Sequence, residues 1–176
     1  MVQLFLLTDP TYLSLLSNVW RLEQVPAKVR KHLNLPIKDY GIDLITETKS
    51  GEYWSIQAKY RTDKNSTLTY EDVSTFTTLT YVTCKNIAWG LVCSTSSRPM
   101  SNKSLISDSV GFLSSDTWLG LDEDGGEGWR LIKGALDDSS ASAPTPMEPL
   151  PFQKECLEIS EDFFTSQGND RGKIVL

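Results

Sequence analysis

The chain has 176 residues, 39% of them hydrophobic and 23% charged, which is typical of a globular domain large enough to bury a core. No apolar run reaches the roughly 20 residues of a membrane-spanning helix. The start also lacks a secretory signal, so we expect a cytoplasmic protein with no membrane partner. Three cysteines at unrelated spacings and a single histidine argue against a zinc site or a His-rich metal centre.

The net charge of -6 is unevenly distributed. Residues 1–110 contain 12 basic and 10 acidic residues, whereas residues 111–176 contain 5 basic and 13 acidic ones. The acidity therefore lies in the last third of the chain. A locally basic groove in the first part, and with it a nucleic-acid partner, stays compatible with the composition.

The first predicted element is a helix that begins after Asp9-Pro10, since an N-cap followed by proline is a common helix start. Apolar residues then recur at helical spacing up to residue 20, namely Tyr12, Leu13, Leu16, Val19 and Trp20. A second, short helix restarts at Pro26 and ends at Leu35-Pro36.

Residues 41–48 and 53–60 predict two strands joined by a turn at 49–52. Thr69, with Asp72 three residues later, predicts the cap of an amphipathic helix. The apolar run 86–93 predicts a buried strand. The order helix, strand, strand, helix, strand predicts an α/β sandwich with a mixed sheet.

The remaining third is less regular. Short helices are expected around Ser114 and Trp129, and residues 137–151 have the composition of a linker. A further helix is predicted from about Phe152 to Phe164, and residues 173–176 begin a strand.

Asp43, Gln57 and Lys59 are the candidate catalytic residues. Residues two apart on a strand point to one face, so Gln57 and Lys59 project together, and Asp43 can face them from the neighbouring strand. We expect Ile56 and Ala58 to form the buried face and Ser55, Gln57 and Lys59 the face of a cleft. The alternative is that these residues lie on an ordinary exposed strand without a catalytic role.

This set of groups suits metal-assisted phosphodiester hydrolysis. Mg²⁺ prefers oxygen ligands, which Asp43, Gln57 and the backbone carbonyl of Ala58 could supply, and Mn²⁺ can substitute for it. A bound cation lowers the pKa of its water. Lys59 would orient or deprotonate that water, or neutralise charge on the phosphate.

The strings DYGIDLI (39–45) and GEYWSIQAKYR (51–61) resemble the Mrr-like branch of the PD-(D/E)xK nucleases, where Gln replaces the last acidic residue. The resemblance implies a restriction-endonuclease-like sandwich, a mixed central sheet flanked by helices. It assigns Asp43 as metal ligand, Gln57 as the second site residue and Lys59 as the catalytic lysine. Such domains carry another acidic ligand on the first helix, for which Glu23 is a substitute or else a solvated charge.

The segments VWRLEQVP, KNIAWGLVCSTS and GFLSSDTW are similar to the same domain in large restriction-type helicases. The tail, PMEPLPFQKECLEISEDFF followed by RGKIVL, resembles the start of a superfamily 2 helicase, in which Gln153 matches the glutamine that contacts adenine. No Walker A loop is present. We therefore expect a nuclease domain at 1–136, a linker at 137–151 and the start of a truncated helicase at 152–176, with ATP used only in the full-length protein.

The function expected from the sequence is that of a Mg²⁺-dependent DNA endonuclease domain of a restriction or defence nuclease-helicase. Lys38, Arg61 and Lys64 flank the motif as DNA-backbone contacts, with surface solvation as the alternative. DNA and the helicase motor are the expected partners, and cutting both strands favours a homodimer. The competing hypotheses are a catalytically inactive DNA-binding or docking module that keeps the nuclease fold, and an unrelated α/β binding protein.

Overall fold

A computed structural model describes residues 1–37, 40–63, 65–97, 109–137 and 151–163. The chain divides into two compact units, Met1–Pro144 and Thr145–Leu176. The first unit contains a five-stranded sheet in the order β1-β2-β3-β4-β5. Strands β1, β2 and β3 pair antiparallel, whereas β3, β4 and β5 pair parallel. The predicted α/β fold with a mixed sheet is confirmed.

The N-terminal segment differs from the prediction. Helix α1 (Val2–Thr8) comes first, and Asp9 then caps α2 (Pro10–Leu15) by accepting hydrogen bonds from the backbone N–H groups of Thr11 and Tyr12. The cap is where the sequence indicates. The predicted continuation of this helix to residue 20 is wrong, because residues Leu16–Arg21 form strand β1.

A β-bulge explains the error. The pairing register of β1 with β2 shifts between Leu16 and Asn18, so Ser17 is an extra residue in the strand. The bulge turns Leu16 and Val19 to the same side of the sheet, where both are buried in one apolar cluster. Two buried residues three apart imitate helical spacing, and the sequence pattern alone cannot distinguish the two structures.

A 3-10 turn, η1 (Leu22–Gln24), leads to α3 (Ala27–His32), the helix expected after Pro26. The predicted hairpin follows as β2 (Leu44–Thr48) and β3 (Tyr53–Lys59), with Gly51 at a φ of 86° in the turn. Strand β2 is shorter than predicted, because regular pairing with β3 begins at Leu44 opposite Ile56.

Helix α4 (Tyr70–Thr78) begins with the expected capping box, in which Thr69 and Asp72 bond to each other's backbone N–H groups. It continues as a π-helical turn, η2 (Leu79–Thr83), and leads into β4 (Ile87–Ser94). Strand β5 (Val110–Leu113) was not anticipated. Its four residues are too few to produce a periodic signal.

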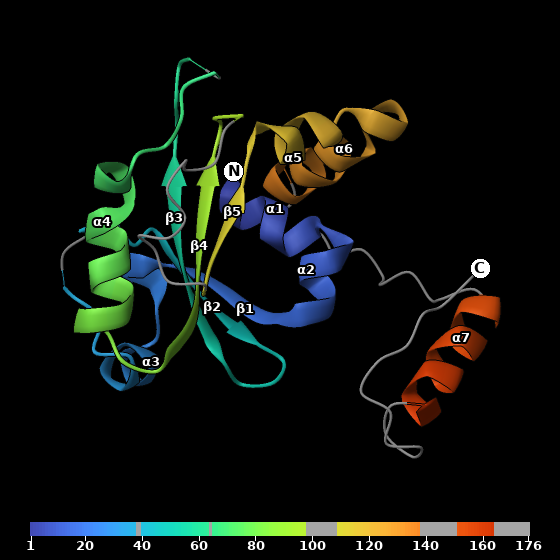
Figure 1. The fold of residues 1–176 in the computed structure, drawn as a ribbon, viewed down its shortest axis with the longest axis horizontal. Coiled ribbons are helices and arrows are strands. Elements are labelled where there is room, and N and C mark those ends of the chain that lie inside the picture. The colour runs from blue at the N-terminus through green and yellow to red at the C-terminus, as the bar shows by residue number, and fades with distance from the viewer. Residues whose placement is uncertain (38–39, 64, 98–108, 138–150, 164–176) are drawn as a thin grey trace. The chain divides into compact units, whose positions relative to one another are not determined.

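Helices cover both faces of the sheet (Figure 1), with α1, α2, α5 (Ser115–Gly120) and α6 (Glu123–Asp137) on one side and α3 and α4 on the other. Each face has its own apolar core. The core under α4 includes Leu33, Ile45, Val73 and Phe76, and the core under α1 includes Phe5, Leu6, Ile56 and Leu91.

The second unit contains α7 (Pro151–Glu161), close to the helix predicted from Phe152. Most of the predicted linker and the predicted strand at 173–176 lie outside the described residues. None of the described helices is long and apolar enough to cross a membrane. Cys84, Cys93 and Cys156 are free thiols, as their spacing indicates.

Candidate functional site

Asp43 stands where β2 and β3 begin to pair. Its backbone N–H donates to the carbonyl of Ile56 (2.9 Å), and its carbonyl accepts from the N–H of Leu22 (3.0 Å). Its carboxylate Oδ2 accepts the backbone N–H of Ala58 at 2.7 Å. The main chain of two neighbouring segments, β3 and η1, therefore fixes Asp43 and its half-buried side chain beside the last residues of β3.

A cavity of about 630 Å³ opens beside that carboxylate. Asp43, Glu23 and Ala58 all line it, together with the first residues of α1. This places both candidate carboxylates on one cavity, beside Ala58 of β3. Carboxylate and carbonyl oxygens are what Mg²⁺ prefers, and one or two carboxylates suffice when substrate phosphate supplies further oxygens.

Two arginines that the sequence analysis overlooked line the same cavity. Arg30 is held by the carbonyls of Leu22 and, at 2.7 Å, Pro36, whereas Arg21 is exposed and its Nε donates to Gln3 at 3.1 Å. No local motif marks either residue, since only the fold brings them to Asp43. They give the cavity positive as well as negative charge.

Lys59 lies on a second, neighbouring cavity of about 480 Å³. Ala58 lines both cavities, so the lysine and the Asp43 carboxylate are on either side of one residue. The walls of this second cavity are mainly apolar and include Trp118 and Trp129. Lys59 itself is half-buried.

The faces of β3 are not arranged as the alternation predicts. Ile56 is buried as expected, but Ala58 is exposed and lines both cavities. Ser55 and Gln57 line neither of the two described cavities. They are buried under α4, where the hydroxyl of Ser55 shares a 2.7 Å hydrogen bond with that of Thr80.

Gln57 is only 4% exposed and lines neither of these cavities. A Cβ placed on Gly41 would lie 3.0 Å from its Nε2, so the amide packs against the glycine that precedes the Asp43 segment. Its Oε1 is buried with no hydrogen-bond partner among the described residues. Such an orphaned acceptor is costly, about 1–3 kcal/mol, unless something satisfies it.

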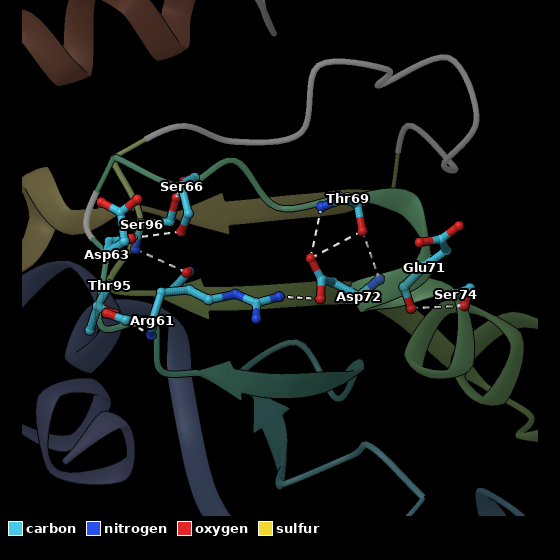
Figure 2. A network of polar contacts seen from close by, with 10 residues as sticks. Arg61, Asp63, Ser66, Thr69, Glu71, Asp72, Ser74, Thr95 and Ser96 are labelled. Atoms are coloured by element: carbon cyan, nitrogen blue, oxygen red, sulfur yellow. Dashed lines mark hydrogen bonds and ion pairs between the residues drawn. The ribbon is translucent and has the colours of Figure 1, made fainter.

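Arg61 takes part in a polar network rather than pointing into solvent (Figure 2). Its guanidinium pairs with Asp72, the residue that closes the capping box of α4. Burial by itself would raise the pKa of the Asp72 carboxyl, but hydrogen bonds from the Thr69 backbone and from Arg61 hold that pKa below its usual value. The ion pair thus joins the end of β3 to the start of α4.

The side chains of three predicted site residues are not described. Lys38 and Lys64 lie outside the described residues, and Gln153 lies in α7. Among the described residues, no group of three or more His, Cys, Asp or Glu side chains could hold a metal ion. A cation at Asp43 would therefore depend on Glu23, main-chain or amide oxygen, and substrate.

The Asp43 carboxylate also affects its surroundings. Burial, and secondly the negative charge of Asp43, raise the pKa of the Cys93 thiol to about 12. Because of this high pKa, the Cys93 thiol, which lines the second cavity, stays protonated and unreactive at neutral pH.

The fold is a mixed sheet covered by helices, with Asp43 just before β2 and Lys59 at the end of β3. The restriction endonuclease family model matches residues 7–107, more than half of the chain. The chain therefore belongs to the restriction endonuclease family. A search of curated protein sequences gave no match.

A solved structure has a similar fold. The chain is similar to part of the ATP-dependent Type ISP restriction-modification enzyme LlaBIII, determined bound to DNA, with 22% sequence identity and a TM-score of 0.53. The alignment covers 99% of this chain and 10% of that enzyme's chain. At this identity the likeness supports the architecture, not the individual site residues.

Proposed function

We propose that this chain is a metal-dependent DNA endonuclease domain that hydrolyses phosphodiester bonds. The observation that carries the proposal is the fixed Asp43 carboxylate, which shares its cavity with Glu23. Ala58, whose N–H bonds to that carboxylate, also lines the cavity of Lys59. Family membership supports the reaction class. The DNA-bound LlaBIII relative supports DNA as the substrate.

Asp43, Glu23 and the carbonyl of Ala58 would hold Mg²⁺ or Mn²⁺, with phosphate oxygens of the DNA completing the set. The amide oxygen of Gln57 is a further candidate, because its buried Oε1 has no hydrogen-bond partner among the described residues and because Gln57 directly precedes Ala58, whose N–H bonds to Asp43. When bound, the cation would polarise the phosphate and acidify a water. Lys59 would orient that water and offset charge on the phosphate oxygens.

The DNA backbone would approach across the two cavities. Lys38 and Lys64 stay proposed phosphate contacts on sequence grounds. For Arg61 the proposal must allow for its ion pair with Asp72, which DNA would have to share or break. Arg21 is the better-placed arginine, since it lines the Asp43 cavity and is exposed.

We also propose that the domain, at 1–136, works beside a helicase motor that belongs to the same polypeptide. The helicase-like tail supports this, with residues 137–151 as linker, 152–176 as the start of the motor and Gln153 as an adenine contact. LlaBIII is described as ATP-dependent, and this chain spans 10% of its length. ATP would then act only through the full-length protein.

A DNA-binding or docking module without catalysis is the second candidate. It is favoured by the absence of a three-acid cluster from the described residues, since a weak cation site can accompany lost activity. Substitution separates the two candidates, because only a nuclease has cleavage to lose.

The test is cleavage of plasmid and single-stranded DNA in Mg²⁺ or Mn²⁺ by the wild-type chain, Asp43→Ala and Lys59→Ala. We expect wild type to cut and both variants to lose cutting while they still bind DNA. Glu47→Gln is the matched control, because Glu47 lies in β2, four residues after Asp43, but bonds to Asn18 and Tyr53. Should wild type stay inactive, also when extended through the motor domain and given ATP, the nuclease proposal fails.

A further inference from the structure

Among the described residues, no strand pairs with the segment that follows Lys59. The parallel pairing of β3 with β4 ends where Lys59 lies opposite Ser94. Beyond that point Tyr60 is 78% exposed, so apolar packing does little to hold the chain. An unrestrained strand end frays, and a side chain on it cannot keep a fixed position.

Thr95 bonds to this segment just beyond the point where the pairing of β3 with β4 ends. Its backbone N–H donates to the carbonyl of Lys59 at 3.3 Å. Its hydroxyl accepts the N–H of Arg61 at 2.7 Å and donates to the carbonyl of the same residue at 3.0 Å. One side chain thus satisfies both main-chain groups of Arg61, as a paired strand would, and restrains the segment that carries Lys59 (Figure 2).

The ion pair of Arg61 with Asp72 is the weaker restraint. The two side chains are 33% and 23% exposed, and pairs near the surface contribute little because solvent screens them. The Thr95 hydroxyl, in contrast, is in a half-buried residue with two short hydrogen bonds. Its neighbour is held too, since the indole N–H of Trp118 donates to the Ser94 carbonyl at 2.8 Å.

We propose that Thr95 is a positioning residue for Lys59. The Thr95 hydroxyl fixes the end of β3, so that the lysine stays beside the Asp43 cavity. This inference rests on the proposed nuclease function. Thr95 also lines the cavity of Lys59, but its assigned role is exerted through the main chain and not on the DNA.

Thr95→Val removes the hydroxyl and keeps the shape of the side chain. Because displacements of about 1 Å cost on the order of 100-fold in rate, we expect kcat for DNA cleavage to fall about 10- to 100-fold. KM and DNA affinity should change less than about two-fold, since no DNA contact is lost. Thr95→Ser, which restores the hydroxyl, should recover most of the rate.

Thr77→Val is the matched control. Its hydroxyl donates to the Ser74 carbonyl at 3.0 Å within α4, so it loses a comparable hydrogen bond away from Lys59. Thr95→Val that cuts as fast as Thr77→Val would overturn the proposal. A serine variant as slow as the valine variant would overturn it too.

A second measurement does not depend on cleavage. Hydrogen exchange of the Arg61 amide reports directly on its bond to Thr95, and it should quicken about 5- to 10-fold in Thr95→Val but not in Thr77→Val. Unchanged exchange contradicts the restraint, even in a protein that does not cut. If exchange is faster in Thr95→Val but the wild type is inactive, also when extended through the motor domain and given ATP, the nuclease function and the catalytic side of this proposal are refuted. Only a structural restraint is then left.

Discussion

The two faces of β3 differ in how completely they are packed. Under α4 the strand is covered as far as Gln57, with Ser55 and Gln57 buried and Phe76 fully enclosed. Under α1 the cover stops at Ile56, and the exposed Ala58 lies between two cavities. The charged groups with candidate chemistry gather where packing is incomplete, because substrate and water can reach a group only there.

Loss of packing on the covered face should have the largest effect. Phe76 is 0% exposed, and Phe76→Ala removes a ring from the centre of that core. We expect a loss of about 3–5 kcal/mol in the free energy of unfolding, enough to unfold many domains of this size. Urea denaturation followed by circular dichroism measures it. Val82→Ala, at a side chain 78% exposed, is the control that should change little.

The open face should respond in the opposite way. Asp43→Asn keeps an acceptor for the Ala58 N–H but removes the charge, so we expect little change in stability and a 100- to 1000-fold slower cleavage, on the order of other losses of charge stabilisation. Single-turnover cleavage and thermal unfolding of the same sample test both parts. A variant that loses stability in proportion to activity would contradict the contrast between the faces.

A buried hydrogen bond on the covered face gives an intermediate effect. Ser55→Ala leaves the Thr80 hydroxyl, 2% exposed, without its 2.7 Å partner, which should cost about 1–3 kcal/mol. The double variant Ser55→Ala/Thr80→Val replaces both partners and should recover much of that loss. If it is less stable than the sum of the single variants, the hydroxyl pair is not the reason.

The smallest effect concerns the two orphaned acceptors. Thr46 Oγ1 and Gln57 Oε1 are both buried without a hydrogen-bond partner among the described residues. Thr46 lines neither described cavity, so Thr46→Val should stabilise the fold by about 1 kcal/mol and leave cleavage unchanged. Gln57→Leu should also be tolerated by the fold but should slow cleavage if the amide serves the site. Equal activity of both variants would remove Gln57 from it.

Local sequence patterns were sufficient to predict several of the helices and strands. The Asp9 and Thr69 caps, the helix after Pro26 and the Tyr53–Lys59 strand follow from capping, proline geometry and β-propensity, which act over a few residues. The pairing of that strand with the Asp43 segment follows from the turn between them. The closeness of Asp43 to the end of β3 was therefore predictable from the sequence.

Tertiary structure decided the rest. The bulge at Ser17 made β1 look helical, because only its pairing with β2 shows which face each residue occupies. Likewise, alternation along β3 assigned Ala58 and Gln57 to the wrong environments, since burial depends on which helix covers each face. The cavity shared by Asp43 and Glu23, its arginines and the Thr95 restraint join residues distant in the chain, and no local pattern encodes such contacts.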